Sequence, residues 1–387
     1  MFGTILLVVC TLMQLYVFAR AASVPVVRRH LPLRWLIVAG VVLWAGLVAA
    51  RLVAHGEEGA TAAVLELLGM DWMAMLFLAC VALLAVDLVT GFGSVLPRLA
   101  PRLRGWALAA AGGMSVVALV QGMRPPVVQR HEVALAGLPR ALDGTVIVAM
   151  SDLHVGSLLG ERWLEARVRQ VEAEHPDLVV LLGDILEGHG QSEERVLPAL
   201  ARLAAPLGVW SVTGNHEFHR RTGGAPASFE AAGFAVLHDR WAEVRPGLVV
   251  AGVDDLTSRY RRDSDEGSIA RALAGVPPGA VVLLSHTPWQ AEQAAAAGAG
   301  LMLAGHTHGG QIWPFGALVG RVYPLLGGRY DVAGMPVIVC RGTGTWGPRM
   351  RLWRPAEILR VALRCAGAEE AATPTPRAEV STMIPPA

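Results

Sequence analysis

Four long apolar stretches fill the first third of the chain, and shorter alternating patterns follow them. Each stretch is about long enough to cross the hydrocarbon core of a bilayer, and three begin with tryptophan, which is enriched at membrane interfaces. One such stretch would also fit a buried helix of a soluble protein, but four in succession predict a transmembrane region of four helices over residues 1–123. The stretches are Phe2–Phe18, Trp35–Ala50, Trp72–Phe92 and Trp106–Met123.

Charged residues between the stretches predict their orientation. Seven arginines lie in the first and third loops, whereas the second loop has only Arg51 beside four acidic residues. Because arginine-rich loops stay in the cytoplasm, we expect a multi-pass membrane protein whose globular part is extracytoplasmic. Arg124 and Arg130, just after the fourth stretch, weigh against this orientation. The seven arginines are Arg20, Arg28, Arg29, Arg34, Arg98, Arg102 and Arg104, and the acids are Glu57, Glu58, Glu66 and Asp71.

Two single residues also bear on the membrane region. Arg20 follows the first apolar run and no basic residue precedes it, so we interpret this run as a retained helix rather than a signal peptide. Asp87 lies inside the third stretch, where a carboxylate is a candidate functional residue. Since Asp87 is close to the end of the stretch, we favour a side chain that reaches the lipid headgroups.

After a connector over residues 124–143, short β-rich runs alternate with helical patterns. Short apolar runs between turn residues are typical of strands buried on both faces, and Arg162–Glu174 is a candidate crossover helix. We therefore expect an α/β domain over residues 144–365, followed by a disordered tail over 366–387 that is rich in Ala, Pro, Thr and Glu. The runs are Thr145–Met150, Leu178–Leu182, Val209–Val212, Leu248–Val253, Val281–Leu284, Leu301–Leu303, Val337–Cys340 and Ile358–Ala362.

Composition excludes some classes of function. Apolar residues make up 53% of the chain and charged residues 17%, and the apolar excess belongs to the membrane region. The net charge of +1 gives no reason to expect nucleic-acid binding. The chain has no lysine, which we ascribe to a bias toward arginine, although guanidinium groups also suit phosphate oxygens. Its four cysteines show no spacing typical of a metal site or a disulfide.

Polar residues follow five of the predicted strands. In open α/β folds ligands bind beyond the carboxyl ends of the strands, so these residues predict one shared site. Asp, Asn and His without Cys favour Mn²⁺, Fe or Zn²⁺. The number of possible ligands exceeds what one ion needs. Two ions that share one carboxylate would use all of them, and two such ions would suit in-line displacement at phosphorus. The segments are Ser151–His154, Gly183–Asp184, Gly214–Glu217, Ser285–His286 and Gly305–Gly310.

This ordered series resembles the calcineurin-like metallophosphoesterase family, whose signature is Asp-x-His, Gly-Asp, Gly-Asn-His-Glu, a lone His and Gly-His-x-His. Every element is present, and the resemblance covers about Val146 to Ala362. The extended forms Ser-Asp-Leu-His and Gly-His-Thr-His-Gly-Gly-Gln look like those of small bacterial phosphodiesterases. Together with the apolar stretches, the chain resembles transmembrane proteins that carry a metallophosphoesterase domain. The resemblance implies two packed mixed β-sheets flanked by helices.

The resemblance also implies a role for each polar residue of the series. His216 matches the family's catalytic histidine beside the scissile oxygen, and Glu217 would orient this histidine or a ligand. Many members carry Asp or Asn three residues after the Gly-Asp aspartate, where this chain has Glu187. This difference affects the expected contacts with a substrate but not the expected metal ligands. The implied ligands of a first metal ion are Asp152, His154, Asp184 and His308, and those of a second ion are the shared Asp184 with Asn215, His286 and His306.

Histidines and arginines outside the series are weaker candidates. We expect loop or helix-end positions for His30, His55, His131 and His175. For His189, His219 and His238 we favour structural positions over contacts with a substrate. The run Arg259–Arg262 fits a solvated loop. The arginines near Trp346 and Trp353 are better candidates for binding an anion. These arginines are Arg341, Arg349, Arg351 and Arg354.

The predicted activity is hydrolysis of a phosphodiester or pyrophosphate. A hydroxide bridging the two ions would attack phosphorus, and His216 would stabilise or protonate the leaving alkoxide. We favour a lipid-linked substrate because the membrane region holds the site near a bilayer. The alternatives are a cytoplasmic-facing hydrolase of UDP-diacylglucosamine, which needs the opposite orientation, an inactive membrane scaffold, and a transporter, which the scarcity of charge in the spans disfavours.

Overall fold

The structure is a computed structural model that describes residues 2–54, 59–156, 159–187, 191–219, 224–260 and 267–366. The predicted tail beyond residue 366 and the candidates His55 and His189 lie outside these ranges. Of the run Arg259–Arg262, residues 261 and 262 also lie outside them, and only the backbone of residues 259 and 260 is described.

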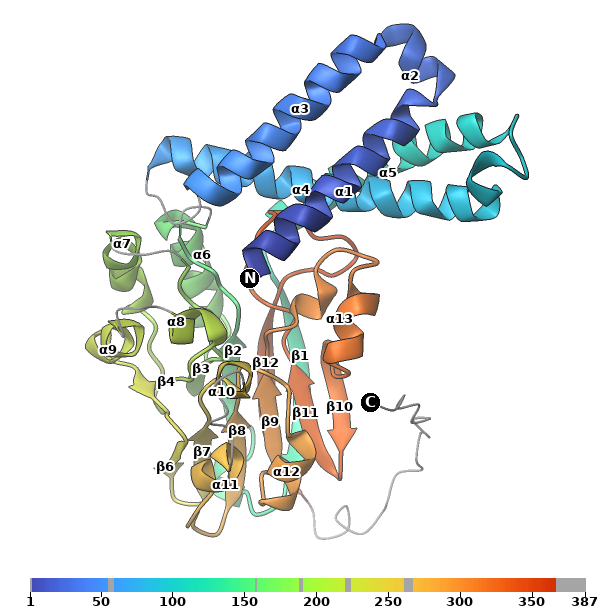
Figure 1. Cartoon of the computed structure of the whole chain (residues 1–387). Coiled ribbons are helices and arrows are strands. Elements are labelled where there is room, and N and C mark those ends of the chain that lie inside the picture. Colours follow the sequence, from blue (N-terminus) through green and yellow to red (C-terminus); the bar gives the residue numbers. More distant parts are fainter. Residues whose placement is uncertain are drawn as a thin grey trace.

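The described part of the membrane region contains four helices long and apolar enough to cross a bilayer, at the top of Figure 1. Their outward surfaces carry large apolar side chains such as Leu12, Val42 and Leu88, each more than half exposed, as expected where lipid replaces water. The four are α1 (Phe2–Ala22), α3 (Leu33–Ala49, continued by a π-helical turn, Ala50–Ala54), α4 (Ala60–Val89) and α5 (Ala100–Met123). The short α2 (Pro25–His30) follows α1, and a 3₁₀ turn (Gly91–Gly93) follows α4.

Asp87 does not reach the lipid headgroups, so this prediction is wrong. Its side chain is fully buried and accepts hydrogen bonds from Tyr16 Oη and Arg104 Nε, each at 2.8 Å. The Nε atom of Arg20 lies 2.6 Å from Asp87 Oδ2, the same oxygen that accepts the bond from Tyr16. A buried carboxylate requires such cationic partners. Asp87 therefore joins α1, α4 and α5 at their arginine-rich ends.

The described part of the second domain contains two six-stranded mixed sheets, which confirms the predicted fold class. In the first sheet β2 to β5 are parallel, β12 is antiparallel to β2, and β1 is parallel to β12. Its strands, in spatial order, are β1 (Val127–Leu135), β12 (Glu357–Cys365), β2 (Val146–Met150), β3 (Leu178–Leu181), β4 (Val209–Ser211) and β5 (Ala235–Val236).

The second sheet has parallel central strands and an antiparallel strand at each edge. Its strands, in spatial order, are β10 (Gly328–Val332), β11 (Met335–Val339), β9 (Leu301–Ala304), β8 (Ala280–Leu284), β7 (Leu248–Gly252) and β6 (Arg240–Arg245). The eight apolar runs correspond to eight strands. The other four, β1, β5, β6 and β10, were not predicted, and β1 occupies the segment interpreted as a connector.

Alternation along each strand explains how the layers pack. Ile147 and Ala149 of β2 belong to the core between the two sheets, whereas Val148 and Met150 belong to the core beneath the outer helices. Side chains of the second sheet divide in the same way. Helices α6 (Glu161–Glu172), α7 (Gln191–Leu200) and α9 (Gly224–Ala231) cover the first sheet, and α10 (Leu256–Tyr260), α11 (Ser268–Ala272) and α12 (Ala291–Ala296) cover the second.

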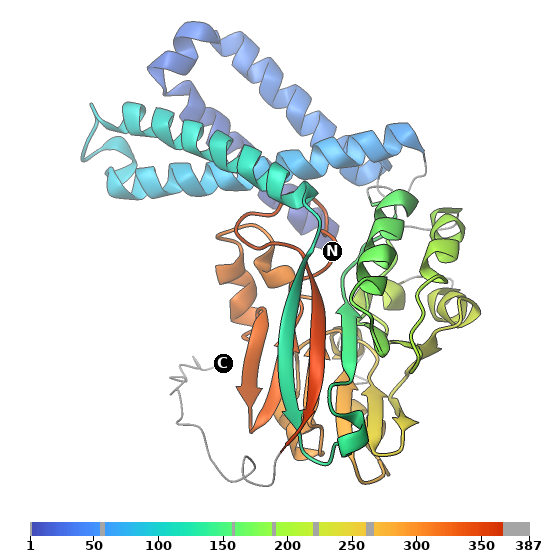
Figure 2. The same cartoon turned by 180° about the vertical axis from the view of Figure 1, so that it is seen from behind.

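The membrane helices pack on the end of the β-sandwich where β2 ends (Figure 2). Asp71 Oδ1 accepts a hydrogen bond from the backbone of Arg349, and Gln121 Oε1 accepts one from the backbone of Trp353, both at 2.8 Å. An apolar cluster of Ala74, Leu78 and Ala118 with Ile312, Met350 and Leu352 lies beside these contacts. The second domain is therefore docked on α4 and α5.

Candidate metal centre

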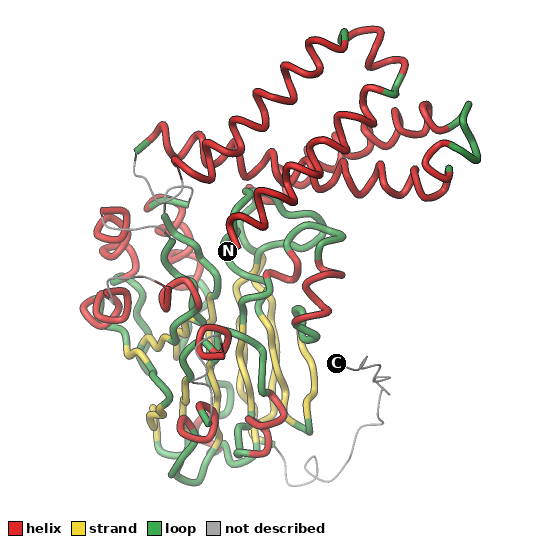
Figure 3. Tube along the Cα trace, viewed as in Figure 1, coloured by secondary structure: helices red, strands yellow, loops and turns green. Residues whose placement is uncertain are grey.

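The five polar segments meet at the carboxyl ends of β2, β3, β4, β8 and β9. Figure 3 shows the loops at this end, between the strands and the membrane helices. Three of the segments come from the first sheet and two from the second, so the site lies across the edge of the sandwich. The third segment forms the short helix α8 (Asn215–His219), and the last contains a 3₁₀ turn, His308–Gly310.

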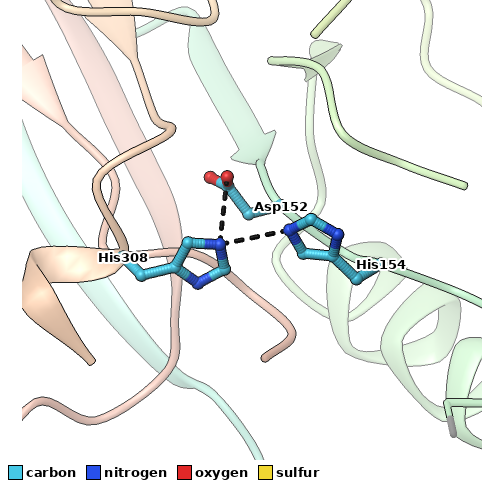
Figure 4. A group of neighbouring side chains, drawn as sticks. All are labelled: Asp152, His154 and His308. Atoms are coloured by element: carbon cyan, nitrogen blue, oxygen red, sulfur yellow. Dashed lines mark hydrogen bonds and ion pairs between the residues drawn. The ribbon is translucent and has the colours of Figure 1, made fainter. Parts of the chain in front are cut away.

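One group of possible ligands consists of Asp152, His154 and His308 (Figure 4). His308 Nε2 lies 3.3 Å from Asp152 Oδ1 and 3.1 Å from His154 Nε2. All three side chains are buried. Three ligand atoms therefore converge on one point from β2 and β9.

A second group consists of Asp184, His286 and His306, with Asn215 beside it. His286 Nε2 lies 3.2 Å from Asp184 Oδ2, 3.1 Å from His306 Nδ1 and 3.2 Å from Asn215 Oδ1. His286 Nδ1 donates to the carbonyl oxygen of Leu182 at 2.8 Å. Because a carbonyl can only accept, this bond places a proton on Nδ1 and leaves Nε2 as the nitrogen directed at the other ligand atoms.

Asp184 lies between the two groups. Its Oδ2 atom is 3.9 Å from the Nε2 atoms of both His154 and His216, and 3.2 Å from that of His286. It is a member of two possible ligand groups, His154–Asp184–His216 and Asp184–His286–His306. One carboxylate thus faces ligand atoms on both sides, which is the arrangement that a shared ligand requires.

The backbone of this site is strained. Five of the six Asp and His residues implied as ligands have left-handed backbone conformations, with φ between 46° and 71°. Each such conformation costs about 1–3 kcal/mol in a residue other than glycine and is held only by its surroundings. The five residues are Asp152, His154, Asp184, His306 and His308.

The surroundings that hold Asp184 are supplied by Glu217. The buried carboxylate accepts hydrogen bonds from the backbone N–H groups of Gly214, Asp184 and Ile185 at 2.7–2.8 Å, and from Leu186 at 3.2 Å. Glu217 therefore ties the loop after β3 to the loop after β4. It orients the backbone of the ligand loops, a role that its place in the motif left undetermined.

We predict that Glu217→Gln weakens metal binding and activity about 10- to 100-fold, as for other partners that support ligands. The amide keeps one oxygen acceptor but turns an N–H₂ group toward backbone N–H donors, which repel it. Metal affinity measured by calorimetry on the full chain checks this. Glu292→Gln, on exposed α12, is the matched control, and equal affinity of both variants would contradict the role of Glu217.

Electrostatics favour the ionised forms of the carboxylates. Burial raises the pKa of Asp184, but His286 and His216 more than offset this and hold the pKa well below its usual range. Burial and then His286 lower the pKa of His306 to about 4, so its ring is neutral at neutral pH. These are the forms of carboxylate and imidazole that bind metal ions.

The residues present fit divalent ions. Asp152 Oδ1 and His154 Nδ1 are buried side-chain atoms without a hydrogen bond in the part of the chain that the structure describes. Buried polar atoms are rarely left in this state unless an ion or water satisfies them. The converging atoms are oxygen and nitrogen without sulfur, a set that suits Mn²⁺, Fe or Zn²⁺.

Comparisons with known proteins agree with this geometry. The family model for calcineurin-like phosphoesterases matches residues 145–310. A protein of Danio rerio described as a transmembrane protein with metallophosphoesterase domain is 31% identical over 327 residues, which is 76% of this chain and 74% of that protein. The chain belongs to the calcineurin-like metallophosphoesterases.

Two other relatives extend the comparison. A protein of the same description from Bos taurus is 31% identical over 268 residues, and the match spans 65% of this chain but only 60% of that protein. An uncharacterized metallophosphoesterase of Aquifex aeolicus is 32% identical over 245 residues, 62% of this chain and 92% of its own length. The metallophosphoesterase family and membrane-protein relatives predicted from the sequence are thus both confirmed.

His216 of this metallophosphoesterase lies at the rim of the site. Its side chain is 27% exposed, whereas Asp152, His154 and His286 are buried, and its ring meets that of His154 edge to face at 4.8 Å between centroids. Its Nδ1 atom lies 3.9 Å from Glu187 Oε1. Burial lowers the pKa of His216, but Asp184 and Glu187 raise it by more, so the net shift is upward. Glu187 Oε2 also lies 3.6 Å from His154 Nδ1, so this carboxylate faces two histidines of the site.

Tyr323, beside the metallophosphoesterase site, was not singled out in the sequence, and Arg351 was expected to bind an anion rather than to support the fold. Tyr323 Oη lies 2.9 Å from His306 Nε2, and Trp289 stacks on the Tyr323 ring. Arg351 is fully buried and donates to four backbone carbonyl oxygens. Neither residue belongs to the motif, and only folding brings their side chains to it.

Several of the weaker candidates make structural contacts in the described part of the chain, whereas the side chain of His219 lies outside the described residues. Arg341 pairs with Glu357, and the burial of Arg351 excludes it as an anion-binding side chain. His238 Nδ1 lies 2.7 Å from Asp254 Oδ1, outside the ligand groups. His30 ends α2, as expected, but His131 lies within strand β1 rather than in a loop or at a helix end, because the segment interpreted as a connector pairs with β12.

Proposed function

We propose that the chain hydrolyses a phosphodiester or pyrophosphate with two divalent ions, Mn²⁺, Fe or Zn²⁺. The observation that carries this proposal is the position of Asp184 between two groups of ligand atoms. One ion would be held by Asp152, His154, Asp184 and His308, and the other by Asp184, Asn215, His286 and His306. When bound, two such ions lower the pKa of water from about 15.7 to about 7 and neutralise charge on phosphoryl oxygens.

The protein's own groups supply positioning and a proton. His216 would donate a proton to the leaving oxygen, since its ring lies at the rim of the site and its partial exposure admits a substrate. The Glu187 carboxylate would hold the imidazolium in place from the Nδ1 side. Glu217 would keep the two ligand loops fixed during turnover, so that little reorganisation accompanies the reaction.

A substrate panel tests this function. The full chain, purified in detergent and supplied with Mn²⁺, is expected to hydrolyse bis(p-nitrophenyl) phosphate or a pyrophosphate diester in preference to p-nitrophenyl phosphate. A chelator should stop the reaction, and added Mn²⁺ should restore it. Hydrolysis that survives complete removal of metal would contradict the proposal.

We further propose that the catalytic domain is extracytoplasmic. The domain docks beside Asp71 and Gln121, whereas Arg20 and Arg104 lie together at the opposite ends of the helices. The positive-inside rule assigns the arginine-rich ends to the cytoplasm. Four spans then return the chain to the outer side.

We predict that a reporter active only outside the cytoplasm is active when it is fused after Asp143. The matched control is the same reporter fused after Phe92, in the arginine-rich third loop, where it should be inactive. The reverse pattern would overturn the orientation and would favour a cytoplasmic nucleotide-lipid substrate such as UDP-diacylglucosamine.

A further inference from the structure

One part of the catalytic domain exposes large apolar side chains. In the described residues from Arg124 onward, seven large apolar side chains are at least 40% exposed, and six of them lie between residues 313 and 353. Soluble surfaces seldom gather apolar groups in this way without a partner. We call these six residues the apolar platform: Trp313, Phe315, Leu318, Val322, Trp346 and Trp353.

The platform is built from two neighbouring segments. Phe315, Leu318 and Val322 lie on or beside the short helix α13 (Gly316–Val322), and the ring centroids of Trp313 and Trp353 are 5.0 Å apart. Gln311 links the segments, because its side chain bonds the backbone of Trp346 in both directions, at 3.0–3.1 Å. The six side chains therefore belong to one continuous structure.

This structure is continuous with the membrane helices. In Figure 1, α13 lies at the end of the catalytic domain that faces α4 and α5, and the Phe315 ring meets Phe77 of α4 edge to face at 5.7 Å. Phe77 follows Asp71 by six residues, or about 9 Å along the helix. Since Asp71 binds the backbone of Arg349 in the domain, it marks the polar boundary, and Phe315 lies on the membrane side of it.

The platform is also tied to the metal ligands. Tyr323, directly after α13, lies 2.9 Å from His306 Nε2. On the other side, His308 is followed by Gly309 and Gly310, which have left-handed backbone conformations and turn the chain directly into the platform. Any lipid held by the platform would therefore have its headgroup next to the ligand loops.

We propose that the apolar platform inserts into the interfacial layer of the bilayer, and that the ester hydrolysed is the phosphoester of a membrane lipid. Tryptophan at this level and apolar residues on a short helix are typical of segments that insert about 5–10 Å. The second part rests on the proposed function, whereas the first part does not. The lipid would reach the metal ligands without leaving the bilayer completely.

Insertion of the apolar platform into the bilayer is tested by fluorescence quenching, which does not require hydrolysis of a substrate. A fluorescent amino acid is placed at position 318 of the full chain in phosphatidylcholine liposomes, and the control probe is placed at position 296, on α12 at the far end of the domain. We expect lipids brominated in the acyl chain to quench the probe at 318, and aqueous iodide to quench the probe at 296. Equal quenching of both probes by iodide would overturn the insertion.

The substrate class is tested with two esters that share one leaving group. Hexadecyl p-nitrophenyl phosphate in vesicles is compared with soluble ethyl p-nitrophenyl phosphate. In the double variant Leu318→Glu and Val322→Glu, the ratio of hexadecyl to ethyl ester hydrolysis should fall about tenfold, because two apolar anchors are lost. Ala296→Glu is the matched control and should keep the ratio of the unmodified chain.

Each outcome separates the two proposals. An unchanged ratio in the platform variant would overturn the lipid substrate. If the glutamates unfold the domain, the ratio of hexadecyl to ethyl ester hydrolysis is measured instead on the milder double variant Leu318→Ser and Val322→Thr, where it should also fall. Absence of hydrolysis of both esters by the metal-loaded unmodified chain would overturn the proposed function, while the quenching result would still decide whether the platform inserts.

Discussion

Asp184→Asn is expected to abolish measurable hydrolysis and to remove most bound metal. The change replaces a shared carboxylate by a neutral amide, whose nitrogen cannot bind an ion. Because Asp184 faces both ligand groups, this one substitution weakens both ion positions. Activity and metal content of the purified full chain measure the effect.

The matched control for this variant is Asp331→Asn, the same chemical change on an exposed residue of β10. It should leave both activity and metal content unchanged. An Asp184→Asn variant that keeps two ions and substantial activity would show that this carboxylate is not shared between them.

His216→Ala is expected to keep the metal but to slow turnover by roughly 10²–10⁴-fold, the contribution of a positioned general acid. The loss should be large for an alkyl leaving group, which needs a proton, and small for p-nitrophenolate, which leaves without one. His238→Ala, which removes an exposed histidine outside the ligand groups, is the matched control.

Two results would contradict this role. An equal loss for both leaving groups would show that His216 does not deliver the proton. Loss of metal from the slow variant would instead move His216 into the ligand set, where the group His154–Asp184–His216 already places its ring.

Much of this structure could be predicted from the sequence because its central strands are buried on both faces. Strands such as β2 and β8 are continuous apolar runs that end in a polar ligand segment, so the same pattern gave the strand and the site. The apolar stretches of the membrane region are equally direct. In both cases the apolar sequence of the segment itself shows that the segment is buried or lies in lipid.

The unpredicted elements depend on their neighbours instead. Strands β1, β6 and β10 lie at sheet edges and carry exposed polar residues on much of their length, so no apolar run marks them. Asp87 was expected to reach the headgroups because the sequence does not show that Arg20 and Arg104 meet it. Tyr323 likewise reaches His306 only through the fold.

The number of ions per active chain tests the central claim most directly. Metal-free full chain is titrated with Mn²⁺ while bound metal and hydrolysis of bis(p-nitrophenyl) phosphate are measured on the same samples. We predict that activity reaches its maximum only when about two ions are bound per chain, as a shared Asp184 requires. Full activity with one bound ion, or with none, would contradict the two-metal site.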